Sequence, residues 1–215
     1  MARRSRDYTI HALHHALTVL ETFLEPGRSV QGVSEIAGRL ALNKSRVFRI
    51  LCTLEQHRFV RRDPQSKQYQ LGVALLAFGE AVRGRMEVIR VADPILDELA
   101  EITGETVHLG VVDGDEAVCI ARRLSQHSVR LYAEVGRRAP LHVGGVPKLL
   151  LAYLPAEEQQ RILHGGALEQ ITDLTVTDPR EIEGTLIQIR KHGYNLSVGD
   201  LDPDVHSIAA PIRDH

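Results

Sequence analysis

Residues 29–72 of this 215-residue chain read SVQGVSEIAGRLALNKSRVFRILCTLEQHRFVRRDPQSKQYQLG. The apolar residues of 33–40 and of 44–57 recur at three- and four-residue steps, which predicts two short helices. Asn43 stands between them, and asparagine is a preferred N-cap residue. The last part, 59–71, alternates apolar and polar residues around a turn. Two helices joined by a tight turn and followed by a hairpin predict a winged helix-turn-helix.

The second of these helices has two distinct faces. Its apolar face comprises Val47, Ile50, Leu51 and Leu54. Its polar face comprises Ser45, Arg49, Cys52 and Gln56. The major groove of duplex DNA admits one helix, and the N-terminal residues of such a helix meet the base edges. This pattern therefore predicts a DNA-binding surface, although an ordinary helical bundle with a solvated face is the alternative.

Arginine reads guanine through two parallel hydrogen bonds, whereas lysine and serine more often reach phosphate oxygens. We therefore expect Arg46 and Arg49 to contact bases. In the hairpin, basic residues would track the phosphate backbone or enter the minor groove. The remaining residues predicted to contact DNA are Ser34, Lys44, Ser45, Arg61, Arg62 and Lys67.

Charge is distributed unevenly along the chain. Residues 1–85 carry 14 Lys and Arg against 7 Asp and Glu, a net charge of +7. Residues 86–215 carry 12 against 21, a net charge of −9, and the whole chain is at −2. A basic first part on an acidic remainder is typical of a DNA-binding domain joined to a domain with another task.

The N-terminal residues predict a first helix with a basic tail before it. The helix ends near Pro26, and its apolar stripe comprises Ile10, Leu13, Leu17, Leu20 and Leu24. Arg3, Arg4 and Arg6 precede it and form either a minor-groove arm or a solubilising tail.

Nothing in the composition predicts secretion or a membrane span. Cys52 and Cys119 are too few for a disulfide framework. The chain has no run of 18 apolar residues, and its basic N-terminus lacks the apolar stretch of a signal peptide. We therefore expect a cytoplasmic protein.

After the hairpin, the pattern predicts a linker and then an α+β domain. Residues 71–90 are compatible with a linker helix whose apolar stripe also suits a dimer contact. Asp93-Pro94 predicts the start of a second helix, which ends at Thr103-Gly104. We expect an antiparallel sheet with helices on one side. Its predicted strands are 106–112, 116–122, 128–134, 194–198 and 205–212, and its further helices are 145–154, 156–163 and 178–192.

The segment LHVGGVPK, residues 141–148, is the most site-like part of this second domain. Two glycines before a helix leave backbone N–H groups bare, and a helix N-terminus attracts anions such as carboxylates. A loop that simply needs glycine conformations is the alternative. The residues considered as metal ligands are His108, Cys119, His142 and His206. Their spacing matches no metal motif, and packing roles explain them equally well.

In order along nearly the whole chain, the sequence resembles the IclR-type bacterial transcriptional regulators. The matching segments are VSEIAGRLALNKSRVFRILCTLEQHRFVRRD, YQLGVALLAFG, PILDELAEITGETVHLGVVDGDEAVCIAR, VGRRAPLHVGGVPKLLLAYLP, TDPREIEGTLIQIRKHGYNLSVGDLDPDV and SIAAPI. The resemblance implies a winged helix-turn-helix at 1–72, a linker helix at 73–92 and an effector-binding domain of GAF- or PAS-like shape at 93–215. It also implies homodimers or homotetramers.

The resemblance further implies an effector site. Gly145 and Val146 stand where backbone amides of the family hold the effector's carboxylate, and Ser207 stands where a small polar residue faces it. Pro147 replaces a frequent family glycine, and Ser197-Val198 replaces a commonly acidic pair. The residues expected in the site are Leu131, Leu141, His142, Gly145, Val146 and Ser207.

The leading functional hypothesis is a transcriptional regulator, a repressor rather than an activator, that binds an operator and responds to a small carboxylate metabolite. No cofactor or resident metal is expected. The alternatives are a constitutive DNA-binding oligomer and an enzyme that transforms the ligand. No nucleophile–base pair, nucleotide-binding loop or paired carboxylate motif supports the enzyme. Because the family usually continues with another strand and helix, we also expect a C-terminus that is incomplete or covered by a partner.

Overall fold

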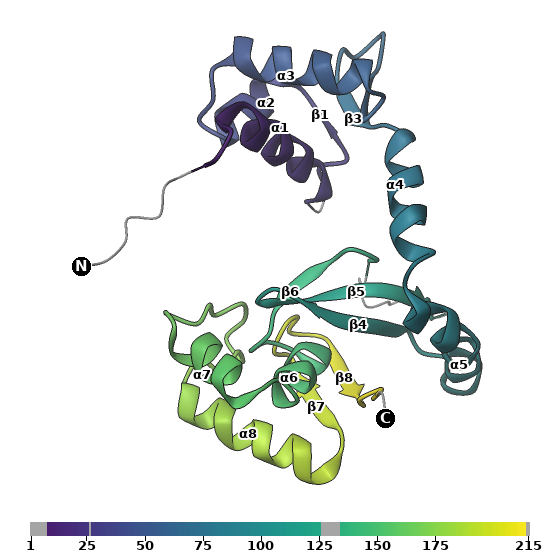
Figure 1. The fold of residues 1–215 in the computed structure, drawn as a ribbon, viewed down its shortest axis with the longest axis vertical. Helices are drawn as coiled ribbons and strands as arrows, with labels where there is room; N and C mark the ends of the chain where they lie inside the picture. The colour runs from purple at the N-terminus through teal and green to yellow at the C-terminus, as the bar shows by residue number, and fades with distance from the viewer. Residues whose placement is uncertain (1–7, 26, 126–133, 214–215) are drawn as a thin grey trace. The chain divides into compact units, whose positions relative to one another are not determined.

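The computed structural model describes residues 8–25, 27–125 and 134–213, and its chain divides into two compact units, 1–85 and 86–215 (Figure 1). The elements of the first unit are α1 (His11–Glu21), the 3₁₀ helix η1 (Thr22–Leu24), β1 (Val30–Gln31), α2 (Val33–Arg39), α3 (Lys44–Gln56), β2 (Val60–Arg62), β3 (Tyr69–Leu71) and α4 (Ala74–Arg83).

One core holds the first unit together. It joins α1, α2 and α3 to the β2–β3 hairpin through side chains that water does not reach: Val19, Ile36, Val47, Leu51 and Tyr69. Val47, Leu51 and Leu54 are buried and Ile50 is half-buried, which confirms the predicted apolar face of α3. The polar face of α3 is consequently left outside this core.

The hairpin carries a third strand that the sequence pattern did not predict. The sheet has the order β1-β3-β2 and is antiparallel throughout, with Val30 opposite Gln70 and Val60 opposite Leu71. At two residues, β1 is too short to show a period-2 pattern. The predicted winged helix-turn-helix is confirmed, with this small strand added.

The second unit is an α+β domain, and its described strands are all antiparallel. Its sheets have the orders β4-β5-β6 and β7-β8. Its elements are α5 (Glu87–Thr103), β4 (Val107–Asp113), β5 (Glu116–Arg123), β6 (Arg138–Pro140), α6 (Gly145–Ala152), α7 (Ala156–His164), α8 (Pro179–His192), β7 (Asn195–Val198) and β8 (His206–Ala209). The strand predicted at 128–134 falls almost entirely outside the described residues.

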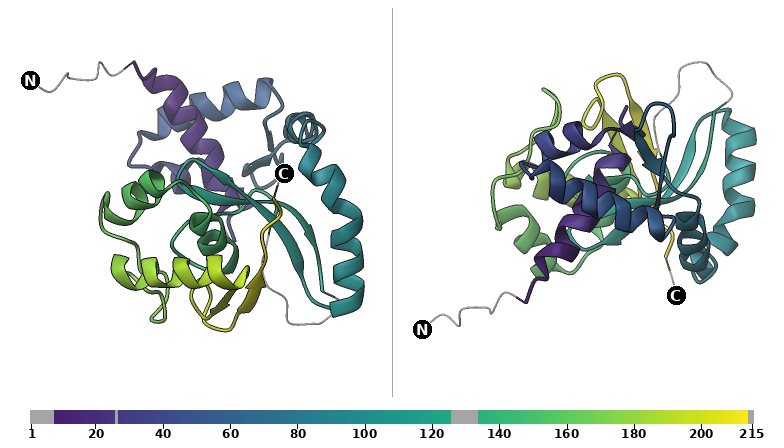
Figure 2. Two further views of the ribbon diagram at one scale, coloured as in Figure 1. Left: turned by 60° about the horizontal axis from the view of Figure 1, so that its bottom comes forward. Right: turned by 90° about the horizontal axis from the view of Figure 1, so that it is seen from above.

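Helices cover both faces of the β4-β5-β6 sheet, so the expectation of helices on one side is wrong (Figure 2). On one face α5 packs Ile89 and Leu96 against Leu109 of β4. On the other face α6 comes so close that a Cβ on Gly110 would lie 2.7 Å from Val146 Cγ1. Side chains alternate between the faces of a strand, so β4 serves both layers.

The predicted helix boundaries between the hairpin and the sheet are also wrong. Instead of one helix over 71–90, α4 ends at Arg83 and α5 begins at Glu87, and the two units divide between them. Pro94 lies inside α5 rather than at its start. Among the described residues, no helix has both the length and the apolar character needed to cross a membrane.

Candidate nucleic-acid interface and ligand pocket

The start of α3 presents a row of exposed polar residues. The Asn43 side chain accepts a 2.8 Å hydrogen bond from the Ser45 N–H, which fixes the first turn as predicted. Lys44, Arg46 and Arg49 are all exposed beside it. Ser34, the predicted contact on α2, is exposed as well. The recognition-helix candidates therefore face solvent together.

The hairpin holds its basic side chains in defined positions. The Arg62 guanidinium lies over the Tyr69 ring, 5.6 Å from its centre. With the Gln70 amide oriented to satisfy its neighbours, its oxygen accepts from Arg61 Nε at 2.9 Å. Lys67 Nζ donates to the Pro64 carbonyl at 2.6 Å. These contacts limit side-chain motion without neutralising charge, which suits the three residues for phosphate contacts.

Ion pairing in the first unit avoids the predicted DNA-binding residues. Arg28 pairs with Glu25 and Glu35, and Arg39 pairs with Glu25. In the described part of the unit, no salt bridge involves Lys44, Arg46 or Arg49 of α3 or the basic residues of the hairpin, Arg61, Arg62 and Lys67. Six basic side chains of α3 and the hairpin therefore carry charge that no salt bridge of the described residues offsets, and a phosphate backbone would meet them there.

The second unit contains a hollow at the N-terminus of α6, with an empty volume of about 440 Å³ that is open to solvent. The lining residues of this α6 hollow are His108, Arg137, Gly144, Gly145, Val146, Pro147, Ser197, Leu201, Asp202, Val205 and Ser207. An adjoining hollow extends it over β5, where Ala117 and Cys119 form part of the wall. The centres of water-sized molecules can occupy about 50 Å³ of the α6 hollow, and the larger volume includes open solvent.

Two backbone N–H groups at the start of α6 are free. The recorded hydrogen bonds of the described residues include none from the N–H of Gly145 or Val146, and both residues line the α6 hollow. Pro147 has no N–H. A Cβ on Gly145 would lie 2.4 Å from Ser207 Oγ, so glycine is what allows β8 to come this close. The free amides and the Ser207 hydroxyl can together donate to an anion.

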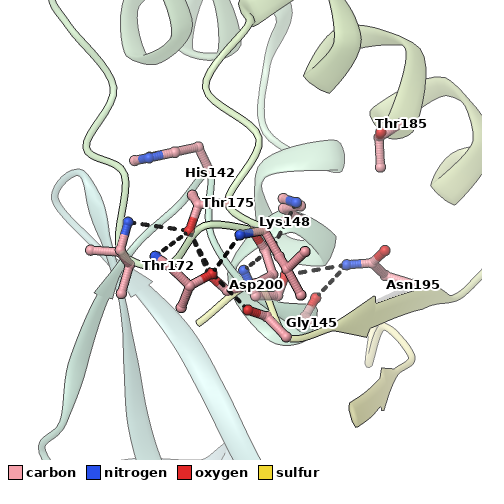
Figure 3. Close-up of polar contacts among 12 residues, drawn as sticks. His142, Gly145, Lys148, Thr172, Thr175, Thr185, Asn195 and Asp200 are labelled. Carbon is pink, nitrogen blue, oxygen red and sulfur yellow. Dashed lines mark hydrogen bonds and ion pairs between the residues drawn. The ribbon is translucent and has the colours of Figure 1, made fainter. Parts of the chain in front are cut away.

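A buried polar network fixes these amides in place (Figure 3). Asp200 Oδ2 accepts from the Gly144 N–H at 2.7 Å and pairs with Lys148 Nζ at 2.6 Å. Asn195 Nδ2 donates to the Gly145 carbonyl at 2.8 Å. The Thr175 hydroxyl donates to the backbone carbonyl of Asp200 at 2.8 Å. The segments around Thr175, Asn195 and Asp200 thus hold the first turn of α6 together.

His108 and Cys119 share the wall of the adjoining hollow, and both are shifted toward their neutral forms. Burial, helped by the positive charge of Arg137, lowers the pKa of His108. Burial also raises the pKa of Cys119, and the nearby arginines oppose this only partly. A reactive cysteine needs a lowered pKa, so this pair is unsuited to act as a thiolate nucleophile with its base.

The four residues considered as metal ligands do not come together. His142 Nε2 lies 2.9 Å from the Glu169 carbonyl oxygen, and His206 is exposed on β8. Among the described residues, no group of three or more His, Cys, Asp or Glu could hold a metal ion.

The predicted effector residues divide into two groups. Gly145, Val146 and Ser207 line the α6 hollow together, whereas Leu141 and His142 are buried beside it and support its loop. Leu131 lies outside the described residues. The sequence pattern does not indicate the lining residues Arg137 and Asp202 or the supporting residues Lys148, Asn195 and Asp200. No sequence signal joins Lys148 to Asp200, because 52 positions separate them.

Both units match family models. A model described as "IclR helix-turn-helix domain" matches residues 12–64, and one described as "Bacterial transcriptional regulator IclR C-terminal" matches residues 80–215. Together they include α3, the start of the hairpin and the whole described α6 hollow.

The chain is similar to known transcriptional regulators over most of its length. The chain is 35% identical over 205 residues to the HTH-type transcriptional regulator BhcR of Paracoccus denitrificans, covering 95% of this chain and 73% of that protein. It is 32% identical to the HTH-type transcriptional repressor AllR of Klebsiella pneumoniae, covering 94% and 74%. A crystal structure of an IclR homolog from Microbacterium hydrocarbonoxydans, complexed with 4-hydroxybenzoate, has a TM-score of 0.80 at 28% identity, covering 94% and 83%.

Proposed function

Because the chain belongs to the IclR family of bacterial transcriptional regulators, we propose that it binds operator DNA through α3 and the hairpin and that a small carboxylate controls this binding from the α6 hollow. The observation that carries the effector part is the pair of free amides at Gly145 and Val146. Repression is the proposed direction, supported by the similarity to a repressor. Such a regulator works beside the chromosome, in the cytoplasm.

The DNA-binding part is tested with DNA from the protein's own promoter in a fluorescence anisotropy titration. Arg46→Ala and Arg49→Ala should each weaken binding by about tenfold, since a bidentate base contact is worth about 1–3 kcal/mol. Lys67→Ala should weaken binding to all DNA sequences alike, and it should lower the salt dependence of that binding by about one counterion. Arg90→Ala is the control, because Arg90 is exposed and pairs with Glu87 in the second unit.

An unchanged affinity in both α3 variants, with Arg90→Ala also unchanged, would reject α3 as the reading helix. A loss in all three variants would instead indicate an unspecific charge effect.

The effector part rests on chemistry that the hollow offers to an anion. The amides of Gly145 and Val146 and the Ser207 hydroxyl are donors, and Arg137 adds a positive charge to the wall. The relative complexed with 4-hydroxybenzoate supports a small carboxylate as the ligand. Asp202 on the rim carries the opposite charge, so a ligand with a donor group away from its carboxylate would fit best.

The effector part is tested with a panel of small carboxylates that includes 4-hydroxybenzoate, each paired with its uncharged carboxamide. A true effector should move the amide ¹H–¹⁵N signals of Gly145 and Val146, raise the melting temperature and change the affinity for promoter DNA. Ser207→Ala should weaken binding of the carboxylate more than binding of its carboxamide. If no carboxylate affects either the amide signals or the DNA affinity, the protein is better described as a constitutive DNA-binding oligomer.

The proposed mechanism requires a symmetric oligomer. A dimer presents its recognition helices to half-sites about 34 Å apart, so a ligand that favours one dimer geometry changes operator affinity. The exposed apolar side chains of Phe78 and Val82, four residues apart on one face of α4, supply a surface for such a contact. Sedimentation of the wild type and of variants that lack these side chains measures their contribution to dimer formation. Conversion of any bound carboxylate to product would favour the enzyme alternative.

A further inference from the structure

The first turn of α6 already holds one buried anion. The side chain of Asp200 is 5% exposed, and its Oδ2 atom accepts from Gly144 N–H, the amide directly before the two free ones. Its Oδ1 atom has no hydrogen-bond partner among the described residues. An anion bound to the Gly145 and Val146 amides would therefore share the same helix N-terminus with a buried carboxylate, and two like charges so close repel strongly.

Lys148 is the group that can remove this conflict. Its Nζ lies 2.6 Å from Asp200 Oδ2, its side chain is 10% exposed, and it extends from the second half-turn of the same helix (Figure 3). No other recorded salt bridge of the described residues involves Asp200. A buried pair of this kind is weak evidence for stability, because the desolvation of both groups offsets their attraction. Its placement suggests a different use.

We propose that Lys148 cancels the charge of Asp200 so that the neighbouring free amides of Gly145 and Val146 can accept an anionic ligand. Asp200 in turn occupies the Gly144 amide and holds the loop, which leaves two of the three donors for the ligand. Lys148 is thus a positioning and charge-setting residue that does not line the hollow. The ligand part of this inference rests on the function proposed above, whereas the local charge balance does not.

The charge balance is tested first without any ligand, by amide hydrogen exchange in the full-length ¹⁵N-labelled protein. Exchange of a free amide near neutral pH is catalysed by hydroxide, so a more negative surrounding slows it and a more positive one speeds it. Lys148→Met should slow exchange at Gly145 and Val146 by about tenfold, and Asp200→Asn should speed it. The double variant and Lys148→Arg should both exchange as the wild type does.

A purely structural role gives a different pattern, because loosening the turn would speed exchange in Lys148→Met as well as in Asp200→Asn. Faster or unchanged exchange in Lys148→Met overturns the proposal. If Lys148→Met does not fold, Lys148→Gln takes its place, and faster or unchanged exchange at Gly145 and Val146 in that variant overturns the proposal. Lys191→Met is the control, since it removes the same charge at an exposed position outside α6.

A ligand titration then tests the consequence, with benzoate and uncharged benzamide as probes followed through the same two amide signals. Lys148→Met should bind benzoate at least about tenfold more weakly than the wild type, and it should bind benzamide equally well. The double variant Lys148→Met/Asp200→Asn should bind benzoate with the affinity of the wild type. Equal benzoate affinity in Lys148→Met overturns the proposal. If the wild type binds no carboxylate, the proposed function fails, while the exchange pattern still decides the charge balance.

Discussion

Gly145→Ala is the substitution for which the structure gives the most definite expectation. The added Cβ would lie 2.4 Å from Ser207 Oγ and 3.3 Å from Ser207 Cβ. Rotation of the hydroxyl relieves the first contact but not the second, so β8 must also move away from α6. Overpacking of this kind costs about 1–3 kcal/mol. At Gly184 of α8 a Cβ meets nothing within 4 Å, and there the same replacement should stabilise the helix by up to about 1 kcal/mol.

The two variants should therefore differ by about 1–4 kcal/mol in the free energy of unfolding. Urea unfolding followed by circular dichroism measures this as a shift in midpoint at constant slope. Ser207→Gly removes the colliding atoms, so the double variant Gly145→Ala/Ser207→Gly should show a coupling energy of about 1 kcal/mol or more. Equal stability of Gly145→Ala and Gly184→Ala, or a coupling energy near zero, would refute this account of the α6–β8 contact.

Three further substitutions test the anchors of the two units. Asn43→Ala should lower the unfolding free energy by about 1 kcal/mol, since the N–H of Ser45 loses its acceptor; urea unfolding of the first unit's helices measures it. Asn195→Ala should cost about 1–3 kcal/mol, because the buried Gly145 carbonyl loses its donor; the same assay applies, and the exposed Asn43 is the comparison. Burial lowers the pKa of His108 in the folded state below the 6.5 of a free histidine, so its contribution to stability is complete above pH 6.5 and is lost as the pH falls below it. Urea midpoints of the wild type should drop more steeply between pH 7 and pH 5 than those of His108→Gln, and parallel slopes would contradict the assignment.

The first unit was predictable because local signals agree with one another there. The N-cap at Asn43, the apolar face of α3 and the turn before Lys67 each specify an element without help from distant residues. The strand β1 escaped prediction because its only support is non-local, namely its pairing with β3.

The boundary errors in the second unit have a tertiary cause. A proline inside a helix costs about 3 kcal/mol, which is why Asp93-Pro94 predicted a helix start. In the fold, Ile89, Ala92 and Leu96 are buried against the sheet, and each large side chain so buried contributes about 1.5–3 kcal/mol. Packing on a sheet that the local sequence does not reveal thus outweighs the proline and extends α5 back to Glu87.

The candidate pocket was only partly predictable for a related reason. Two glycines at 144–145, at the start of a predicted helix, indicate free backbone N–H groups, and this local signal predicted Gly145 and Val146 as site residues. Lys148, Asn195 and Asp200 are brought together by the return of β7 to α6, a long-range contact that composition and periodicity do not encode.

The β4-β5-β6 sheet lies between two helices, with α5 on one face and α6 on the other. Leu109 faces α5 and Gly110 faces Val146 of α6, so adjacent positions of one strand belong to different neighbourhoods. In a saturation mutagenesis map of β4, phenotypes should therefore alternate from residue to residue. Substitutions on the α5 face would alter the response to a ligand that they never touch, because the strand they distort is also part of the wall of the α6 hollow.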